Sequence, residues 1–94
     1  MIDIKHYKTK DYCKVKFTLA VEAKKVEIFG LNGEWKKGAA MAKKKEGGFA
    51  LELNLPKGSQ HEFKYFIDKK NWENDSSTGS TQNVFGTTNS VLSL

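Results

Sequence analysis

The sequence predicts an all-β domain, an antiparallel sandwich or a small barrel, on the basis of three observations. Apolar and polar residues alternate with a period of two in several segments, as in strands that bury one face. Turn-forming Gly, Asn and Pro separate these segments at short intervals. No segment shows a long helical stripe, and the best helix candidate, Ala20–Lys25, is too short to be stable alone. A chain of 94 residues has room for one core.

The chain divides into a leader at residues 1–11 and a single domain at residues 12–94. The leader is polar, and it could pair along the edge of a sheet. The first strand of the domain is expected at Cys13–Leu19, with its apolar residues on one face and lysines on the other. Because Cys13 lies on the apolar face, we expect an inert, buried thiol and no nucleophile. A single cysteine forms no internal disulfide, which is typical of a reducing cytoplasm.

The remaining strands follow in short segments. Val26–Phe29 is apolar and ends at Gly30, and a brief strand is expected at Ala40–Lys43. Phe49–Leu55 alternates most strongly, since every second residue is large and apolar. Turns are predicted from the following sequence signals: Asn32-Gly33, Gly47-Gly48 and Pro56-Lys57-Gly58.

The C-terminal part begins with Glu62–Ile67, which alternates again and directs Phe63, Tyr65 and Ile67 to one face. Short strands are expected at Asn71–Asn74 and Ser90–Leu94, which brings the total to about seven. The stretch between them, Asp75–Asn89, is long for a loop in so small a domain. Long loops in compact folds are often functional, so this stretch is a candidate for binding.

Composition and charge argue against several classes of function. The formal net charge is +5, and all 16 basic residues are lysines. Arginine is the residue that binds phosphates and guanine edges in a bidentate manner, so its absence disfavours nucleic-acid binding. A lysine-rich solvated surface explains the charge. The sequence has neither an apolar run of membrane-spanning length nor a signal peptide, so we expect a cytoplasmic protein without membrane contact.

Two tryptophans, Trp35 and Trp72, both stand where a strand pattern ends in a turn. Because polar residues and glycine flank them, we expect their rings at or near the surface. A Ser/Thr/Asn-rich stretch at residues 76–90 contains one large apolar residue, Phe85. Flat rings match the C–H face of a sugar, and hydroxyl and amide groups match its hydroxyl rim. Candidate groups for that rim are Lys64, Thr87, Thr88 and Asn89.

Six short pieces then occur in order: Gly30-Leu31-Asn32-Gly33-Glu34-Trp35, Leu55-Pro56-Lys57-Gly58, Glu62-Phe63-Lys64-Tyr65-Phe66-Ile67-Asp68, Trp72, Asn74-Asp75 and Phe85-Gly86-Thr87-Thr88-Asn89-Ser90-Val91. Together they resemble carbohydrate-binding module family 48, over about residues 12–94. This family includes N-terminal domains of isoamylases and glycogen-branching enzymes, and the glycogen-binding domain of the AMP-activated protein kinase beta subunit. The resemblance implies an immunoglobulin-like β-sandwich.

The implied function is non-catalytic binding of α-1,4-glucans such as glycogen, starch and maltooligosaccharides, with a glycogen-metabolising enzyme as a possible partner. In the family, two tryptophans stack on glucose rings, while a lysine and an asparagine hydrogen-bond sugar hydroxyls. A large apolar residue pushes against the curved glucan, and a threonine precedes the asparagine by two positions. The carbohydrate-binding residues that the resemblance implies here are Trp35, Lys64, Trp72, Phe85, Thr87 and Asn89.

Two alternatives stay open at this point. The turns beside the tryptophans, at residues 31–35 and 67–71, are longer than in the family, which motivates a protein–protein interaction or scaffold domain with no working sugar site. A basic β-rich domain with exposed aromatic rings is also compatible, more weakly, with single-stranded nucleic acid as the ligand.

No catalytic residue, metal site or cofactor is expected. The carboxylates are too scattered to predict the facing pair of a glycosidase. His6 and His61 lie far apart and lack the spacing of metal ligands, so we expect both on the surface.

Overall fold

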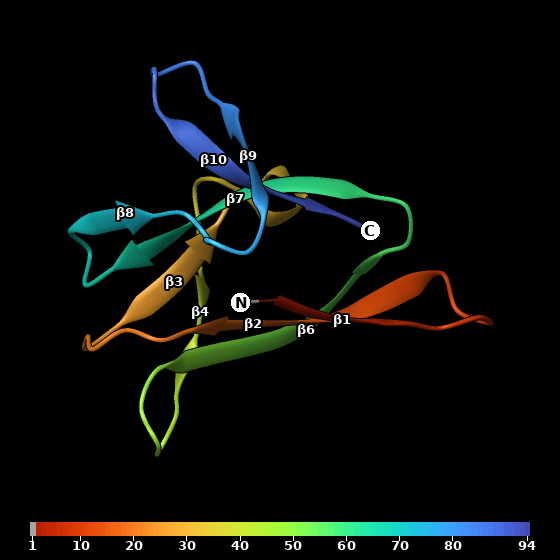
Figure 1. Cartoon of the computed structure of the whole chain (residues 1–94), viewed down its shortest axis with the longest axis horizontal. Coiled ribbons are helices and arrows are strands. Elements are labelled where there is room, and N and C mark those ends of the chain that lie inside the picture. The colour runs from red at the N-terminus through yellow and green to blue at the C-terminus, as the bar shows by residue number, and fades with distance from the viewer. Residues whose placement is uncertain (1) are drawn as a thin grey trace.

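The computed structural model describes residues 2–94, which form two antiparallel sheets packed into a sandwich (Figure 1). The first sheet has four strands in the order β1-β2-β6-β5. Their bounds are Ile2–His6 for β1, Tyr12–Leu19 for β2, Phe49–Pro56 for β6 and Ala42–Lys43 for β5. Strands β2 and β6 pair along their whole length, from Tyr12 opposite Pro56 to Leu19 opposite Phe49.

The second sheet has six strands, with β4-β3-β7-β10-β9 in order and β8 paired to β7 beside β10. Their bounds are Val26–Phe29 for β3, Ala39–Ala40 for β4, Gln60–Ile67 for β7, Asn71–Glu73 for β8, Gly79–Gln82 for β9 and Thr88–Ser93 for β10. A 3₁₀ turn, η1, at Leu31–Gly33 is the one helical element among the described residues. Nothing in residues 2–94 forms a helix long and apolar enough to cross a membrane.

The core lies between the two sheets and consists of the apolar faces that the alternation predicts. In β2 the buried side chains are Cys13, Val15 and Phe17, and all three are fully inaccessible to solvent. The Phe17 ring meets Phe63 of the other sheet edge-to-face at 5.4 Å between centroids. The other buried apolar residues are Val26, Ile28, Leu31, Met41, Phe49, Leu55, Tyr65, Ile67 and Leu92. The expectation of a buried, free Cys13 is therefore confirmed.

The structure has more strands than the sequence predicts. The expected strand at 40–43 is two strands in different sheets, because the chain crosses the edge of the sandwich at Met41, which is buried and donates its N–H to Val26 O at 2.9 Å. Strand β9 lies inside the stretch expected to be a loop. Residues Ile2–His6 pair with β2 at a sheet edge. The division between leader and domain stays a prediction, and Met1 lies outside the described residues.

Strand β7 positions the functional region. It pairs with β3 on one side and with β10 and β8 on the other, so it is central in its sheet. Its buried residues alternate with Glu62, Lys64 and Phe66, which therefore point away from the core. The outer face of this sheet thus carries two charged side chains and an aromatic ring in a row.

Candidate functional site

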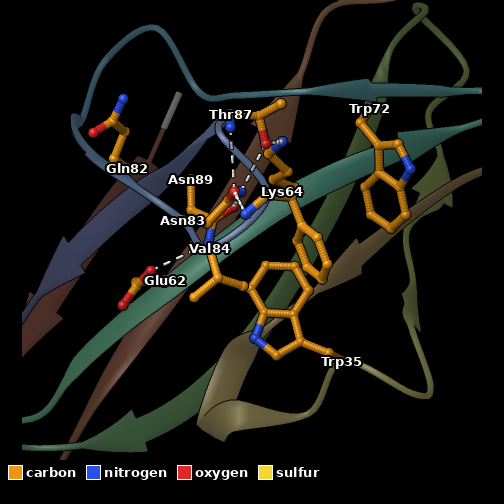
Figure 2. Close-up of a pocket in the computed structure, with 10 residues that line it drawn as sticks. Trp35, Glu62, Lys64, Trp72, Gln82, Asn83, Val84, Thr87 and Asn89 are labelled. Carbon is orange, nitrogen blue, oxygen red and sulfur yellow. Dashed lines mark hydrogen bonds between the residues drawn. The ribbon is translucent and has the colours of Figure 1, made fainter.

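The outer face of the six-stranded sheet contains an open hollow of about 1070 Å³, which we call the main hollow (Figure 2). Strand β7, the strand β8 beside it, the β9–β10 hairpin and the segment after η1 all contribute to it. Ten residues line it: Trp35, Glu62, Lys64, Trp72, Gln82, Asn83, Val84, Phe85, Thr87 and Asn89. All six residues that the family resemblance implies for a sugar site are therefore brought together in one place. Thr88, the further candidate for the sugar rim, does not line the hollow, and its hydroxyl accepts from Asn74 Nδ2 at 2.9 Å.

Trp72, in β8, is held by two phenylalanines on the same sheet face. Its ring stacks on Phe66 with 4.2 Å between centroids and an interplanar angle of 19°. Phe29 meets the same ring edge-to-face at 5.2 Å. Such aromatic contacts stabilise a fixed ring orientation. Since Phe66 covers one face of the indole and 47% of the residue remains exposed, the other side of the ring is free for a ligand.

Trp35 follows η1, lines the main hollow and is positioned by a glycine. Gly30 has φ of 103°, and a Cβ built there would lie 2.5 Å from Trp35 Cζ2. The indole therefore packs directly on the Gly30 backbone. Backbone bonds from Gly30 N to Glu34 O at 2.8 Å and from Glu34 N to Leu31 O at 3.1 Å close the intervening turn. Trp35 stays 41% exposed, so the expectation of surface rings is confirmed for both tryptophans.

His61 holds this turn in place from the core side of β7. The expectation that His61 lies on the surface is wrong. It is only 6% exposed, because it faces the core side of β7. The Asn32 N–H donates to His61 Nδ1 at 3.1 Å, and Ser59 Oγ lies 2.8 Å from Nε2. Ser59 already donates to Pro56 O, so the neutral imidazole carries its proton on Nε2. Burial lowers the pKa of His61, which favours this neutral form.

Phe85 stands at the tip of the β9–β10 turn, which is folded around the Asn83 side chain. Asn83 Oδ1 accepts the backbone N–H groups of Phe85 and Thr87 at 2.9 and 3.3 Å. Asn83 N donates to Thr87 O at 2.9 Å, which closes the turn. Phe85 is 86% exposed and the neighbouring Val84 is 92% exposed. The turn therefore presents two large apolar side chains to solvent beside the tryptophans.

The polar residues of the main hollow form one connected network. Lys64 Nζ donates to Thr87 Oγ1 at 3.3 Å, and Asn83 Nδ2 donates to the same oxygen at 2.8 Å. Asn83 Nδ2 also donates to Asn89 Oδ1 at 3.0 Å, and Asn89 Nδ2 donates to Glu62 Oε1 at 3.1 Å. Asn89 is 6% exposed, so its amide mainly joins the turn to β7.

Sequence reasoning missed two of the network's members, although both left a signal. Glu62 precedes Lys64 by two positions in a strand, which places the two side chains on the same face. Asn83 precedes Phe85 by two positions, the spacing at which an Asn side chain accepts a backbone N–H in an Asx turn. The role of His61 left no such signal, because its partner Asn32 is 29 positions away.

The chemistry of the main hollow suits a neutral, hydroxyl-rich ligand with apolar faces. Aromatic rings provide flat apolar surfaces, and the network provides donors and acceptors at fixed positions. Within residues 2–94 no three His, Cys, Asp or Glu side chains cluster in a way that could hold a metal ion.

Residues 13–94 match the family described as the glycogen recognition site of AMP-activated protein kinase. A comparison with curated proteins finds no significant match. The family is a carbohydrate-binding module, a non-catalytic domain that binds glycogen, and this agrees with the hollow of aromatic rings and hydrogen-bonding groups. The chain therefore belongs to the family of the glycogen recognition site of AMP-activated protein kinase.

Proposed function

We propose that the main hollow is the glucan-binding site, and that it takes a linear α-1,4-linked segment of glycogen, starch or a maltooligosaccharide. The observation that supports this most directly is that all six predicted residues line one hollow on one sheet face. Trp35 and Trp72 stack on glucose rings in this proposal. Phe85, at the exposed tip of its turn, packs against the curved inner side of the glucan.

Lys64 and Thr87 form the hydrogen bonds to the sugar hydroxyls, and Asn89 supports them through the polar network. Lys64 uses one of its three N–H donors on Thr87 in the free protein, so the others can reach a ligand. Asn89 is already engaged on both sides and contributes mainly by fixing the network. With few stacked rings and hydrogen bonds, we expect a dissociation constant on the order of micromolar to millimolar.

The proposed role is binding without catalysis. Glu62 is the one acid among the ten residues lining the main hollow, whereas glycoside hydrolysis uses two facing carboxyl groups. We further propose that the domain acts in the cytoplasm, where a free thiol such as buried Cys13 stays reduced, and that it brings a glycogen-metabolising enzyme to its polymer.

The test is a titration of the purified protein with maltoheptaose, followed by tryptophan fluorescence. We expect a saturable change that glycogen competes away and that is lost in W72A. A Trp72→Phe variant keeps an aromatic ring on Phe66 and should retain part of the affinity. The urea midpoint of each variant controls for folding. A folded W72A protein that binds at full strength would contradict the proposed site. A wild-type response that stays flat to about 10 mM would contradict the proposed function and support a scaffold role.

A further inference from the structure

A second, smaller hollow of about 170 Å³ lies beside the main hollow on the same sheet, and we call it the side hollow. Gln60, Glu62, Thr81 and Val91 line it. Glu62 is the residue that lines both hollows. In Figure 2, Glu62 and Gln82 lie on the side of the main hollow away from Trp72. The side hollow therefore continues the main hollow beyond its polar end.

Strand register explains why these four residues meet. Val91 of β10 is opposite Glu62 of β7, and Thr81 of β9 is opposite Asn89 of β10. Side chains of directly paired residues lie on the same face, so all of them share the outer face with Lys64. The residue opposite Val91 on β9 is Gly79, and a Cβ there would meet nothing within 4 Å. The missing side chain leaves space over Val91.

The side hollow offers polar groups around an apolar floor. Val91 is half-buried and supplies the floor. Thr81 is also half-buried, and within the described part of the chain its hydroxyl has no hydrogen-bond partner. Gln60 Nε2 donates to Ser93 Oγ at 3.3 Å, which leaves the Gln60 carbonyl oxygen for another donor. Glu62 uses Oε1 on Asn89, and its second oxygen is free to accept.

This arrangement differs from the main hollow in chemistry. It contains no aromatic ring on which a sugar could stack, and three of its four residues hydrogen-bond through oxygen atoms or an amide. Acceptors and one hydroxyl suit a ligand that donates several O–H groups. A glucose residue, with hydroxyls around an apolar C–H face, has that character.

We infer that the side hollow is an additional, non-stacking subsite that holds one further glucose residue of a glucan bound in the main hollow. The inference rests on the proposed function, because the chain must first be held by the main hollow. Glu62 is the residue at the junction: it fixes Asn89 with one oxygen and accepts from the sugar that passes between the hollows with the other.

The test is a calorimetric titration with maltooligosaccharides from three to eight glucose units. The double variant Gln60→Ala/Thr81→Val removes the amide and the hydroxyl group that line the side hollow. Thr81→Val exchanges one β-branched residue for another, so the β propensity of β9 is preserved. We expect wild-type affinity to rise with ligand length and to level off one unit later than in the double variant. The longest ligands should lose about three- to tenfold in affinity, and the shortest ligands should bind both proteins equally.

Ser80→Ala is the matched control, because Ser80 neighbours Thr81 in β9 but lies outside both hollows. It should reproduce the wild-type length dependence. Superimposable curves for wild type and the double variant would overturn the subsite while leaving the main hollow intact. An equal loss at every ligand length would also overturn it, because the substitutions would then act on the main hollow. A wild-type protein that binds no oligosaccharide overturns both proposals.

Discussion

Gly30 determines where Trp35 lies, and it does so because it lacks a side chain. A Cβ at this position would come within 2.3 Å of Glu62 O and 2.5 Å of Trp35 Cζ2, and φ of 103° disfavours any L side chain. We expect Gly30→Ala to lower the free energy of unfolding by about 2–5 kcal/mol, from backbone strain and overpacking together. Maltoheptaose affinity should fall with it, because the indole is displaced. Urea unfolding and fluorescence titration measure the two effects.

Gly33 is the matched control for this prediction. It lies in the same turn and also has positive φ, 75°, but a Cβ there would meet nothing within 4 Å. Gly33→Ala should therefore cost only the strain, about 1–2 kcal/mol, with the glucan affinity nearly unchanged. If both alanine variants bind glucan as wild type does, contact with Gly30 does not position Trp35.

At the scale of elements, the β9–β10 turn holds Phe85 in place because the Asn83 side chain makes hydrogen bonds across it. Asn83→Ala removes the side-chain bonds to Phe85 N, Thr87 and Asn89. The turn is exposed and can loosen without unfolding the sheets, so we expect a cost in unfolding free energy of only about 1–2 kcal/mol. Maltoheptaose affinity should fall about tenfold, because Phe85 must then be ordered on binding.

Asn83→Asp distinguishes the hydrogen bonds that the Asn83 side chain accepts from those that it donates. A carboxylate still accepts from the backbone N–H groups of Phe85 and Thr87, but it has no N–H to donate to Asn89 Oδ1 or Thr87 Oγ1. Its affinity should fall between those of wild type and the alanine variant. Full-strength binding by a folded Asn83→Ala protein would show that the turn needs no such support.

The elements also show which parts of the fold a sequence can reveal. The expected strands at Cys13–Leu19 and Phe49–Leu55 match β2 and β6 within one residue at each end, since one buried face imposes strict alternation. Strand β9, Gly-Ser-Thr-Gln, buries no apolar residue and exists through its pairing with β10, so no local pattern predicts it. The split of residues 39–43 depends likewise on two sheets meeting at Met41.

The candidate site likewise contains residues that the sequence reveals and contacts that only the folded structure reveals. Trp35, Trp72 and Phe85 could be recognised because large aromatic residues in polar surroundings are unusual, and a family resemblance supplied the polar partners. The contacts that hold these rings, Phe66 under Trp72 and Gly30 under Trp35, join positions whose proximity only the folded sheet establishes. Sequence therefore predicts which residues face a ligand better than which residues orient them.

For the molecule as a whole, the binding face and the core are coupled through β7. Its outward side chains Glu62 and Lys64 line the main hollow, while its inward side chains His61, Phe63 and Tyr65 are buried in the sandwich. Tyr65 donates to Asp75 at 2.6 Å, which ties the segment after Trp72 to the core. Burial, with the Asp75 carboxylate beside it, raises the pKa of Tyr65, so this hydroxyl stays protonated as a donor. Changes on the buried side of β7 should therefore affect binding on its outer side.

His61 provides the clearest test of that coupling, through pH. Burial lowers its pKa in the folded protein below the ordinary value of 6.5, so the folded state favours the neutral imidazole. The stability that depends on this neutral form is fully present above pH 6.5 and is lost as pH falls through the folded-state pKa. Protonated Nδ1 can no longer accept the Asn32 N–H, so the turn carrying Trp35 should loosen over the same range.

We therefore expect both the urea midpoint and the maltoheptaose affinity to decrease as pH is lowered from about 7 towards 5. Burial alone would raise the pKa of Asp75, but hydrogen bonds from Ser77 and Tyr65 outweigh this effect and leave the pKa lowered. The stability that ionised Asp75 contributes is therefore lost only at more acidic pH. His61→Asn retains an acceptor near Asn32 and does not titrate, so its midpoint and affinity should be flat over this range. A wild-type profile as flat as that of the His61→Asn variant would mean that protonation of His61 does not change glucan affinity.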